Sequence, residues 1–197
     1  MRMSAPREVD AVVVGASAGG IDALIALLRE LPANWRLPMV VVLHLPEGYD
    51  SRLAEVFQHR LPIPVCEAAD KAAVAPGTLY FAPSGYHLSI ERTHVFSLSC
   101  EPPVRWSRPS IDVLMSSAAD AFGARLAGML LTGANDDGAE GLLHIHQAGG
   151  LTAVQEPTEA QVDVMPLAAM QRHAPDHVLP LSKLRALLLQ LDSIHAI

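Results

Sequence analysis

Three short apolar runs constrain what this chain can fold into more than any other feature of its sequence. They span Ala11–Val14, Met39–Leu43 and Leu126–Leu131, and none of them contains a polar side chain. A strand with one buried face alternates apolar and polar residues, whereas a strand buried on both faces is apolar throughout. The runs therefore predict strands of a parallel sheet that helices cover on both faces.

Helical periodicity follows the predicted strands and supports this architecture. An Ala- and Leu-rich helix is predicted over Ile21–Glu30, with an acidic residue in its first turn and Pro32 ending it. Strand-like alternation over 78–82 and 87–99 predicts a hairpin at one edge of the sheet, with its turn at Arg92-Thr93. Further strands are predicted at 63–66 and 151–154, and further helices from Asp50 or Ser51 to Arg60, from Ser110 or Asp112 to Phe122, and over 138–148, 166–172 and 182–191, the last capped by Ser182.

Length and composition limit the class of protein. With 197 residues the chain is sized for one domain, expected over 1–197. Its formal net charge of -7 and its 5% aromatic content argue against a nucleic-acid or anionic-membrane partner. No apolar stretch is long enough for a signal peptide or membrane insertion, so a cytoplasmic location is expected. The cysteines, Cys66 and Cys100, cannot form a disulfide framework and are expected to be small buried hydrophobic residues.

The candidate site lies where the predicted strands end, because ligands of open α/β sheets bind beyond the carboxyl ends of the strands. The first run continues into Gly15-Ala16-Ser17-Ala18-Gly19, which satisfies G-x-S-x-G, the strand–turn–helix pattern that exposes a nucleophilic serine. The helix that follows offers unpaired N–H groups suited to a developing oxyanion. The alternative is a turn of small residues that packs helix on strand, since short motifs often match by chance.

Two further strand ends carry side chains that could serve Ser17. The second run ends in His44, and the first two strands are expected to be neighbours, so both side chains would emerge at one edge of the sheet. Asp136 and Asp137 follow the third run in a Gly-rich loop, where aspartate is also favoured as a turn former or helix cap. In a triad, one of these carboxylates would accept the Nδ1–H of His44 and stabilise its imidazolium. His44 could instead be a hydrogen-bonded rim residue.

Other polar and aromatic residues carry weaker signals. His144 and His146 are two positions apart on a predicted helix, so they do not face one another, and no metal site is expected. Several aromatic residues could line a substrate cleft, although packing explains them equally well. A basic set is expected to form ordinary surface charges. The aromatic set is Tyr49, Tyr80, Tyr86 and Trp106, and the basic set is Lys71, Arg105 and Arg108.

Short motifs occur in a specific order along most of the chain. Any one of them is a weak signal, but their joint order and spacing are highly specific. They are Val14–Gly20, Val42–Tyr49, Ala75–Pro83 with His87, Arg108–Leu114, Leu131-Thr132-Gly133, Asp137–Gly141 and Gln147–Gly150. In these motifs the chain resembles the protein-glutamate methylesterases of bacterial chemotaxis, the CheB family.

The resemblance implies a doubly wound, mostly parallel sheet and a serine-esterase triad. The family's nucleophile falls on Ser17, its base on His44, and its acid on Asp137, the aspartate directly before the glycine, rather than Asp136. Family members remove methyl esters from glutamyl side chains of chemoreceptors, releasing methanol, and can deamidate receptor glutamines. The implied mechanism is acyl transfer through Ser17, with no cofactor, followed by hydrolysis of the glutamyl-serine ester.

The chain departs from the family pattern beside the nucleophile and in the acid loop. Ala18 stands where the family often has threonine, and Ala134-Asn135 replaces the usual Met-Gly. Both changes leave the backbone N–H groups in place, so altered substrate fit is expected rather than lost chemistry. The candidates for oxyanion or substrate binding are Ala18, Gly19 and Ala134.

Regulation and partners follow from the same resemblance. The family's regulatory form carries an N-terminal receiver domain, and Met1–Glu8 is too short to hold one, so no receiver domain is expected. The implied substrate is the cytoplasmic helices of methyl-accepting chemoreceptors. A stand-alone esterase, a trimmed catalytic domain and control by a separate response-regulator partner all stay open.

Rival functions are a catalytically weak signalling scaffold, a general small-ester hydrolase and a nucleotide-binding module. The sequence argues against the last of these. Ser17 stands at the second glycine of G-x-G-x-x-G, and His44 replaces the acid that binds ribose.

Overall fold

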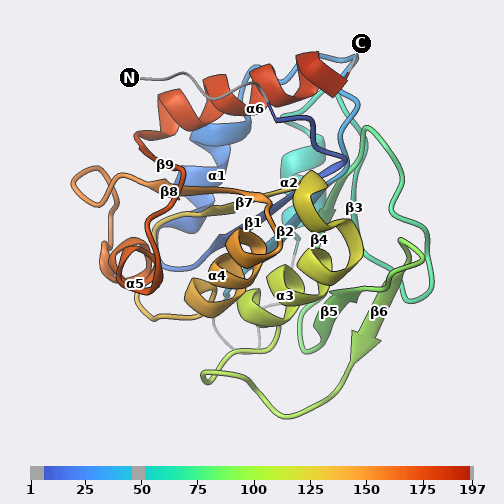
Figure 1. Ribbon diagram of the computed structural model, residues 1–197. Coiled ribbons are helices and arrows are strands. Elements are labelled where there is room, and N and C mark those ends of the chain that lie inside the picture. Colours follow the sequence, from blue (N-terminus) through green and yellow to red (C-terminus); the bar gives the residue numbers. More distant parts are fainter. Residues whose placement is uncertain (1–6, 46–51, 196–197) are drawn as a thin grey trace.

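The computed structural model describes residues 7–45 and 52–195 and has a seven-stranded sheet at its centre (Figure 1). The strand order is β3-β4-β2-β1-β7-β8-β9, and every neighbouring pair is parallel. An antiparallel pair, β5-β6, forms a separate small sheet. The predicted α/β class is confirmed. The strands are β1 (Ala11–Ala16), β2 (Met39–Leu43), β3 (Val65–Glu67), β4 (Leu79–Phe81), β5 (His87–Ile90), β6 (Phe96–Ser99), β7 (Leu126–Leu130), β8 (Leu151–Gln155) and β9 (His177–Leu179).

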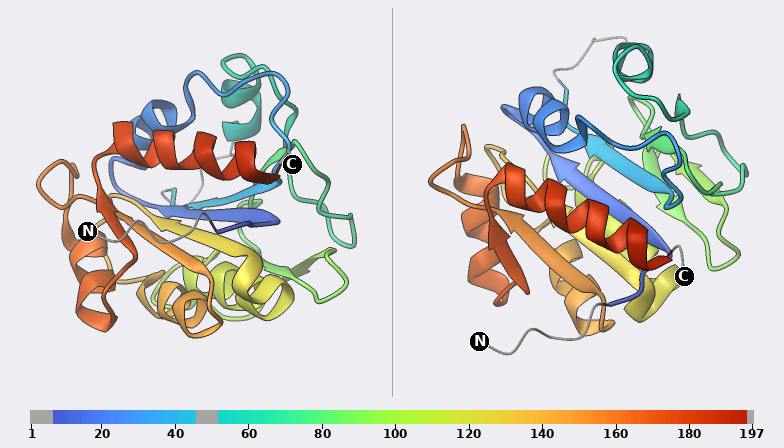
Figure 2. Two further views of the ribbon diagram at one scale, coloured as in Figure 1. Left: turned by 45° about the horizontal axis from the view of Figure 1, so that its top comes forward. Right: turned by 90° about the horizontal axis from the view of Figure 1, so that it is seen from above.

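Helices cover both faces of the large sheet (Figure 2). One layer holds α1, α2 and α6, and the opposite layer holds α3, α4 and α5 together with the β5-β6 hairpin. A short 3-10 turn, Gly123–Arg125, leads into β7. The helices are α1 (Gly20–Leu28), α2 (Leu53–Gln58), α3 (Ile111–Phe122), α4 (Ala139–Gln147), α5 (Val164–Arg172) and α6 (Leu181–His195).

The apolar runs are explained by burial on both faces of the sheet. Along β1, Val12 and Val14 pack with the α1, α2 and α6 layer, whereas Ala11 and Val13 pack with the α3, α4 and α5 layer. All six residues of β1 and all five of β2 are buried. A polar side chain at any of these positions would lose its water contacts without a partner, which costs free energy.

Four local predictions are wrong, and one strand was not predicted. The strand predicted over 78–82 is present as β4, but it is an interior strand of the large sheet between β3 and β2 and not part of the hairpin, because its pattern does not say which strand it pairs with. The strand β9 was not predicted. Ser182 lies inside α6, whose first residue, Leu181, donates its N–H to the Glu159 carboxylate at 2.6 Å. The other two errors concern Cys66 and Cys100, which are exposed, because β3 is an edge strand and Cys100 follows the end of β6. The predicted caps Asp50 and Ser51 lie outside the described residues.

The sheet has a switch point beside β1 that marks where a ligand would bind. The chain passes from β1 to its neighbour β2, and later returns to β7 on the other side of β1. The carboxyl ends of these three strands therefore meet at the crevice where doubly wound folds bind their ligands. Within the described ranges, no helix combines the length and apolar character needed to cross a bilayer.

Candidate active site

Ser17 and His44 lie side by side at the carboxyl ends of adjacent strands. The parallel register of β1 and β2 pairs Ala16 with Leu43, and the His44 N–H continues this ladder by donating to the Ala16 carbonyl at 3.0 Å. On the other side, the Ser17 N–H donates to the Thr132 carbonyl at 2.9 Å. The predicted pairing of the first two strands is confirmed, and Ser17 also bonds to the residue that follows β7.

The turn after Ser17 places the start of α1 beside its hydroxyl. The Gly20 N–H donates to the Ser17 carbonyl at 2.7 Å, and Gly19 adopts a φ of 77°, which favours glycine. A Cβ on Gly19 would stand 2.6 Å from Gln161 Oε1, so this position has no room for a side chain. Ser17 itself has no left-handed φ, unlike the serine of a strained elbow. Its hydroxyl makes no hydrogen bond with any described residue.

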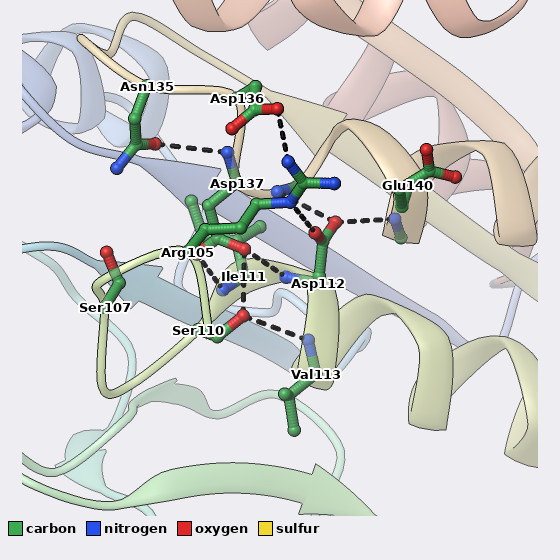
Figure 3. Close-up of polar contacts among 12 residues, drawn as sticks. Arg105, Ser107, Ser110, Ile111, Asp112, Val113, Asn135, Asp136, Asp137 and Glu140 are labelled. Atoms are coloured by element: carbon green, nitrogen blue, oxygen red, sulfur yellow. Dashed lines mark hydrogen bonds and ion pairs between the residues drawn. The ribbon is translucent and has the colours of Figure 1, made fainter. Parts of the chain in front are cut away.

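Asp137 is fully buried and accepts hydrogen bonds on both carboxylate oxygens (Figure 3). Oδ1 accepts from the Ser110 hydroxyl at 2.8 Å and from the Asp112 N–H at 3.0 Å. Oδ2 accepts from the Ile111 N–H at 2.7 Å and lies 2.8 Å from His44 Nε2. These donors belong to the first turn of α3, where free N–H groups and the helix dipole stabilise a negative charge.

The surroundings of Asp137 keep it ionised. Burial alone would raise the pKa of this carboxyl, but the hydrogen bond with His44 and those from the Asp112 and Ile111 N–H groups outweigh burial, so the pKa is lowered. An ionised carboxylate only accepts hydrogen bonds, so the proton shared with His44 belongs to Nε2. In the neutral tautomer that this contact favours, the lone pair of His44 is on Nδ1, on the other side of its ring.

The orientation of the His44 ring differs from the prediction. Asp137 contacts Nε2 rather than Nδ1, because the first turn of α3 holds the carboxylate on that side of the ring. The nitrogen left for proton transfer is Nδ1, and the Ser107 hydroxyl lies 3.5 Å from it. Ser107 was not predicted as a site residue, because it lies 63 positions from His44 and belongs to no recognisable motif.

Asp136 and Arg105 form a separate cluster beside the triad candidates. Asp136 is half-exposed and pairs with Arg105 (Figure 3), whereas the hydrogen bond of His44 to this loop is with Asp137. Arg105 Nε also donates to Asp112 at 3.1 Å. The expectation that Arg105 is an ordinary surface charge is wrong, because it bridges the loop that precedes α3 to the loop that precedes α4. Asp112 in turn accepts from the Gly138 and Gly141 N–H groups at 2.9 and 2.7 Å.

Thr132 belongs to the motif Leu131-Thr132-Gly133, and the structure gives it a supporting role that the motif did not reveal. Its side chain is buried, and its hydroxyl donates to the Ala18 carbonyl at 2.8 Å while accepting the Val162 N–H at 2.9 Å. The Val162 carbonyl also accepts the Gly133 N–H at 3.1 Å. Thr132 therefore ties the end of β7 to the turn that follows Ser17 and to the loop that precedes α5.

The predicted oxyanion candidates keep their backbone N–H groups available. Ala18 is exposed, and Gly19 is half-buried. In the described part of the chain, the N–H groups of Ala18, Gly19 and Ala134 have no hydrogen-bond acceptor. An N–H group without a protein acceptor can bind a substrate oxygen.

The remaining aromatic and basic residues considered in the sequence are either packed in the core or exposed on the surface. Tyr80 is a core residue that packs edge-on against Phe96, and its hydroxyl accepts the Ala75 N–H. Tyr86 and Trp106 are exposed, by 42% and 99%. Tyr49 lies outside the described residues. As predicted, Lys71 is a surface charge and pairs with Glu91, while Arg108 donates to the Cys100 and Glu101 carbonyls.

The chain matches one family model over most of its length. The model described as CheB methylesterase matches residues 12–188. A relative from Leptospira interrogans, named provisionally as a protein-glutamate methylesterase/protein-glutamine glutaminase, is 40% identical over 183 residues, which cover 93% of this chain and 95% of that protein. Protein-glutamate methylesterase/protein-glutamine glutaminase 1 of Hahella chejuensis is 45% identical over 179 residues, covering 89% and 49%.

A further relative and a solved structure agree with this match. Protein-glutamate methylesterase FrzG of Myxococcus xanthus is 38% identical over 179 residues, covering 91% of this chain and 54% of FrzG. The chain thus spans about half the length of the Hahella and Myxococcus proteins. The crystal structure of the Thermotoga maritima CheB methylesterase catalytic domain superposes with a TM-score of 0.88 at 30% identity, covering 93% of this chain and 99% of that one.

Proposed function

This chain belongs to the CheB methylesterase family, and we propose from that premise that it hydrolyses γ-methyl esters of glutamyl side chains on chemoreceptors through Ser17, His44 and Asp137. The observation that carries the proposal is the 2.8 Å contact between His44 and the buried Asp137 at the strand end next to Ser17. This arrangement holds a base in one tautomer beside a hydroxyl that has no other partner among the described residues.

The first half of the proposed reaction is acylation of Ser17. His44 Nδ1 takes the hydroxyl proton as Ser17 Oγ attacks the ester carbonyl, and Asp137 stabilises the imidazolium. The carbonyl oxygen becomes negatively charged and is bound by the free N–H groups of Ala18 and Ala134. His44 then returns the proton to the departing methoxide, so that methanol leaves and a glutamyl-serine ester remains.

The second half regenerates the enzyme. Water loses a proton to His44 and attacks the glutamyl-serine ester, and the products are glutamate and free Ser17. A glutamine side chain would pass through the same acyl-enzyme, with ammonia leaving in place of methanol. The names of the Leptospira and Hahella relatives include a glutaminase activity, which supports this second substrate.

The proposal is tested by methanol release from membranes that contain a methylated chemoreceptor. We expect the wild-type chain to release methanol and Ser17→Ala to release none, with both proteins folded by circular dichroism. Ser17 is half-buried and its hydroxyl has no described partner, so the substitution should leave stability nearly unchanged. Release from neither folded protein would contradict the proposal and favour a signalling scaffold. Hydrolysis of small esters without methanol release from receptors would favour a general small-ester hydrolase.

A further inference from the structure

Trp106 is the most exposed large apolar residue of the described chain. Its side chain is 99% exposed, whereas the other exposed large apolar residues reach at most 45%. Trp106 lies in the loop between β6 and α3, where it contributes nothing to the core. Tryptophan is enriched in binding hot spots because it supplies a large contact area at a small cost in conformational entropy.

The backbone that presents Trp106 is strained. Val104 and Ser107 close a tight turn with reciprocal N–H to carbonyl hydrogen bonds of 3.1 and 2.9 Å. The two central residues, Arg105 and Trp106, have φ values of 47° and 65°. Both values lie in the left-handed region, which favours glycine or asparagine and disfavours a large side chain. Strain of this kind persists only where surrounding contacts maintain it, and it concentrates at functional sites.

The contacts that maintain this turn come from the candidate active site. Arg105 binds Asp136 in the acid loop and Asp112 in the first turn of α3. At the base of the loop, the buried His87 donates from Nε2 to the Pro102 carbonyl at 3.0 Å, and its Nδ1 accepts the Ser110 N–H at 3.2 Å. The turn is therefore held at its tip and its base while the indole remains free. A side chain held in place in advance loses less entropy on binding.

The position of Trp106 relates it directly to the candidate triad. The next residue, Ser107, places its hydroxyl 3.5 Å from His44 Nδ1. Two further exposed apolar side chains lie at the same edge of the sheet. Ile21, 43% exposed, follows Ser17 at the start of α1, and Tyr86, 42% exposed, follows the end of β4. Ile21 therefore follows the strand end that carries Ser17, and Tyr86 follows the end of a parallel strand of the same sheet.

We propose that Trp106 is a substrate-positioning residue, whose indole packs against the apolar side of the protein helix that carries the esterified glutamate. The inference rests on the proposed function and identifies how the same site selects its substrate. A small ester reaches Ser17 and His44 without touching Trp106, but a helix docked at this edge contacts the indole. Docking by an apolar helix face is a common mode of recognition between proteins.

The kinetic test compares a protein substrate with a small ester. We expect Trp106→Gly to lower kcat/KM for a methylated chemoreceptor cytoplasmic fragment at least about tenfold, mainly through KM. The glycine suits the left-handed φ, so the turn is retained, and hydrolysis of 4-nitrophenyl acetate should change less than about twofold. Trp106→Phe keeps an aromatic ring and should recover most of the loss. Met170→Ala, which truncates an exposed apolar residue near the end of α5, is the matched control.

A fluorescence test observes the docking itself. The chain has two tryptophans, and Trp35 is buried with its Nε1–H bonded to the Leu37 carbonyl, so acrylamide quenching reports on Trp106. In the Ser17→Ala variant, which holds substrate without turnover, the methylated fragment should protect Trp106 from quenching. A Trp106→Phe chain with Ser17→Ala should show no such change.

The outcomes separate this inference from the proposed function. Wild-type methanol release that Trp106→Gly leaves unchanged would overturn the role of Trp106 and leave the proposed function standing. Protection of Trp106 that grows with protein concentration in the absence of substrate would overturn it in favour of contact between copies of this chain. A wild-type chain that releases no methanol would overturn both.

Discussion

His44 Nε2 lies 2.8 Å from Asp137 Oδ2, and this contact decides which ring nitrogen can act as the base. The carboxylate is anchored by N–H groups at the start of α3, so its position does not depend on His44. Because Asp137 is ionised, Nε2 carries the proton and Nδ1 is left with its lone pair. Proton transfer from a serine would therefore run through Nδ1.

Asp137→Asn should abolish most of the esterase activity. An amide has a single oxygen and no negative charge. Its NH₂ group would therefore face a backbone N–H in either orientation, that of Ile111 or that of Asp112, and the charge that stabilises the His44 imidazolium would be lost. The equivalent exchange in a serine-protease triad lowers kcat by about 10⁴-fold, and we expect a loss of about 10³- to 10⁴-fold in methanol release.

Asp136→Asn is the matched control for that substitution. Asp136 lies one position earlier in the chain and forms a partly exposed ion pair with Arg105. We expect Asp136→Asn to lower methanol release less than about tenfold, since a partly exposed ion pair contributes little free energy. A larger loss in Asp136→Asn than in Asp137→Asn would show that the acid is Asp136.

Ser107→Ala should retain most of the activity that Ser17→Ala removes. The Ser107 hydroxyl is 3.5 Å from His44 Nδ1, at the outer limit of a hydrogen bond, so its removal should lower kcat/KM no more than about threefold. The measurement is methanol release from the same receptor membranes by both variants. The reverse ranking would make Ser107 the nucleophile.

The parts of this molecule that the sequence predicts are those with local signals. A strand buried on both faces has to be apolar along its whole length, so the runs that became β1, β2 and β7 could be identified from composition alone. Their ends then placed Ser17 and His44 at one edge, because parallel strands share the direction of their carboxyl ends. The three-residue strand β9 is too short for periodicity to appear.

The supporting contacts of the site have no local signal. Thr132 bonds to Ala18 across 114 positions, and Arg105 reaches Asp136 across 31. Such contacts depend on how loops from different strand ends fold over one another. The orientation of the His44 ring is equally non-local, because it is set by where the start of α3 holds Asp137. The sequence can indicate that His44 and Asp137 are partners and still assign the wrong ring nitrogen to their contact.

Thr132→Val should destabilise the protein and remove the hydrogen bonds that join the end of β7 to the turn after Ser17 and to the loop before α5. The exchange conserves shape but leaves the Ala18 carbonyl and the Val162 N–H without their partner. An unsatisfied buried group costs about 1–3 kcal/mol, and the two groups left here are only partly buried. We therefore expect the low end for each, a combined loss of about 2 kcal/mol in the free energy of unfolding. Thr132→Ser keeps the hydroxyl and should cost about 1 kcal/mol, the value of a buried methyl group. Equal urea midpoints for the two variants would contradict this role.

His173 should make the stability of the α4–α5 side depend on pH. Burial, and then the neighbouring charge of His146, lower the pKa of His173 from its ordinary value of 6.5, despite the opposing effect of Asp176. The centroids of the His173 and His146 rings are 4.8 Å apart, and the buried Nδ1 of His173 has no hydrogen-bond partner among the described residues. The unfolded chain therefore binds a proton at higher pH than the folded chain does.

This difference fixes the sign of the pH effect. The contribution of His173 to the free energy of unfolding is complete above the unfolded pKa of about 6.5 and is lost as the pH falls through the folded-state pKa. His173→Gln keeps a donor for Thr152, which His173 Nε2 approaches at 3.3 Å, but cannot be protonated. Urea unfolding at pH 7.5 and pH 5.5 should show a smaller loss of midpoint in the variant than in the wild type. Identical losses would mean that His173 is protonated equally in both states. His146→Gln removes the charge of His146, the second cause of the lowered His173 pKa. It should reduce the loss of urea midpoint at pH 5.5 only in part, because burial is the larger cause of the lowered pKa.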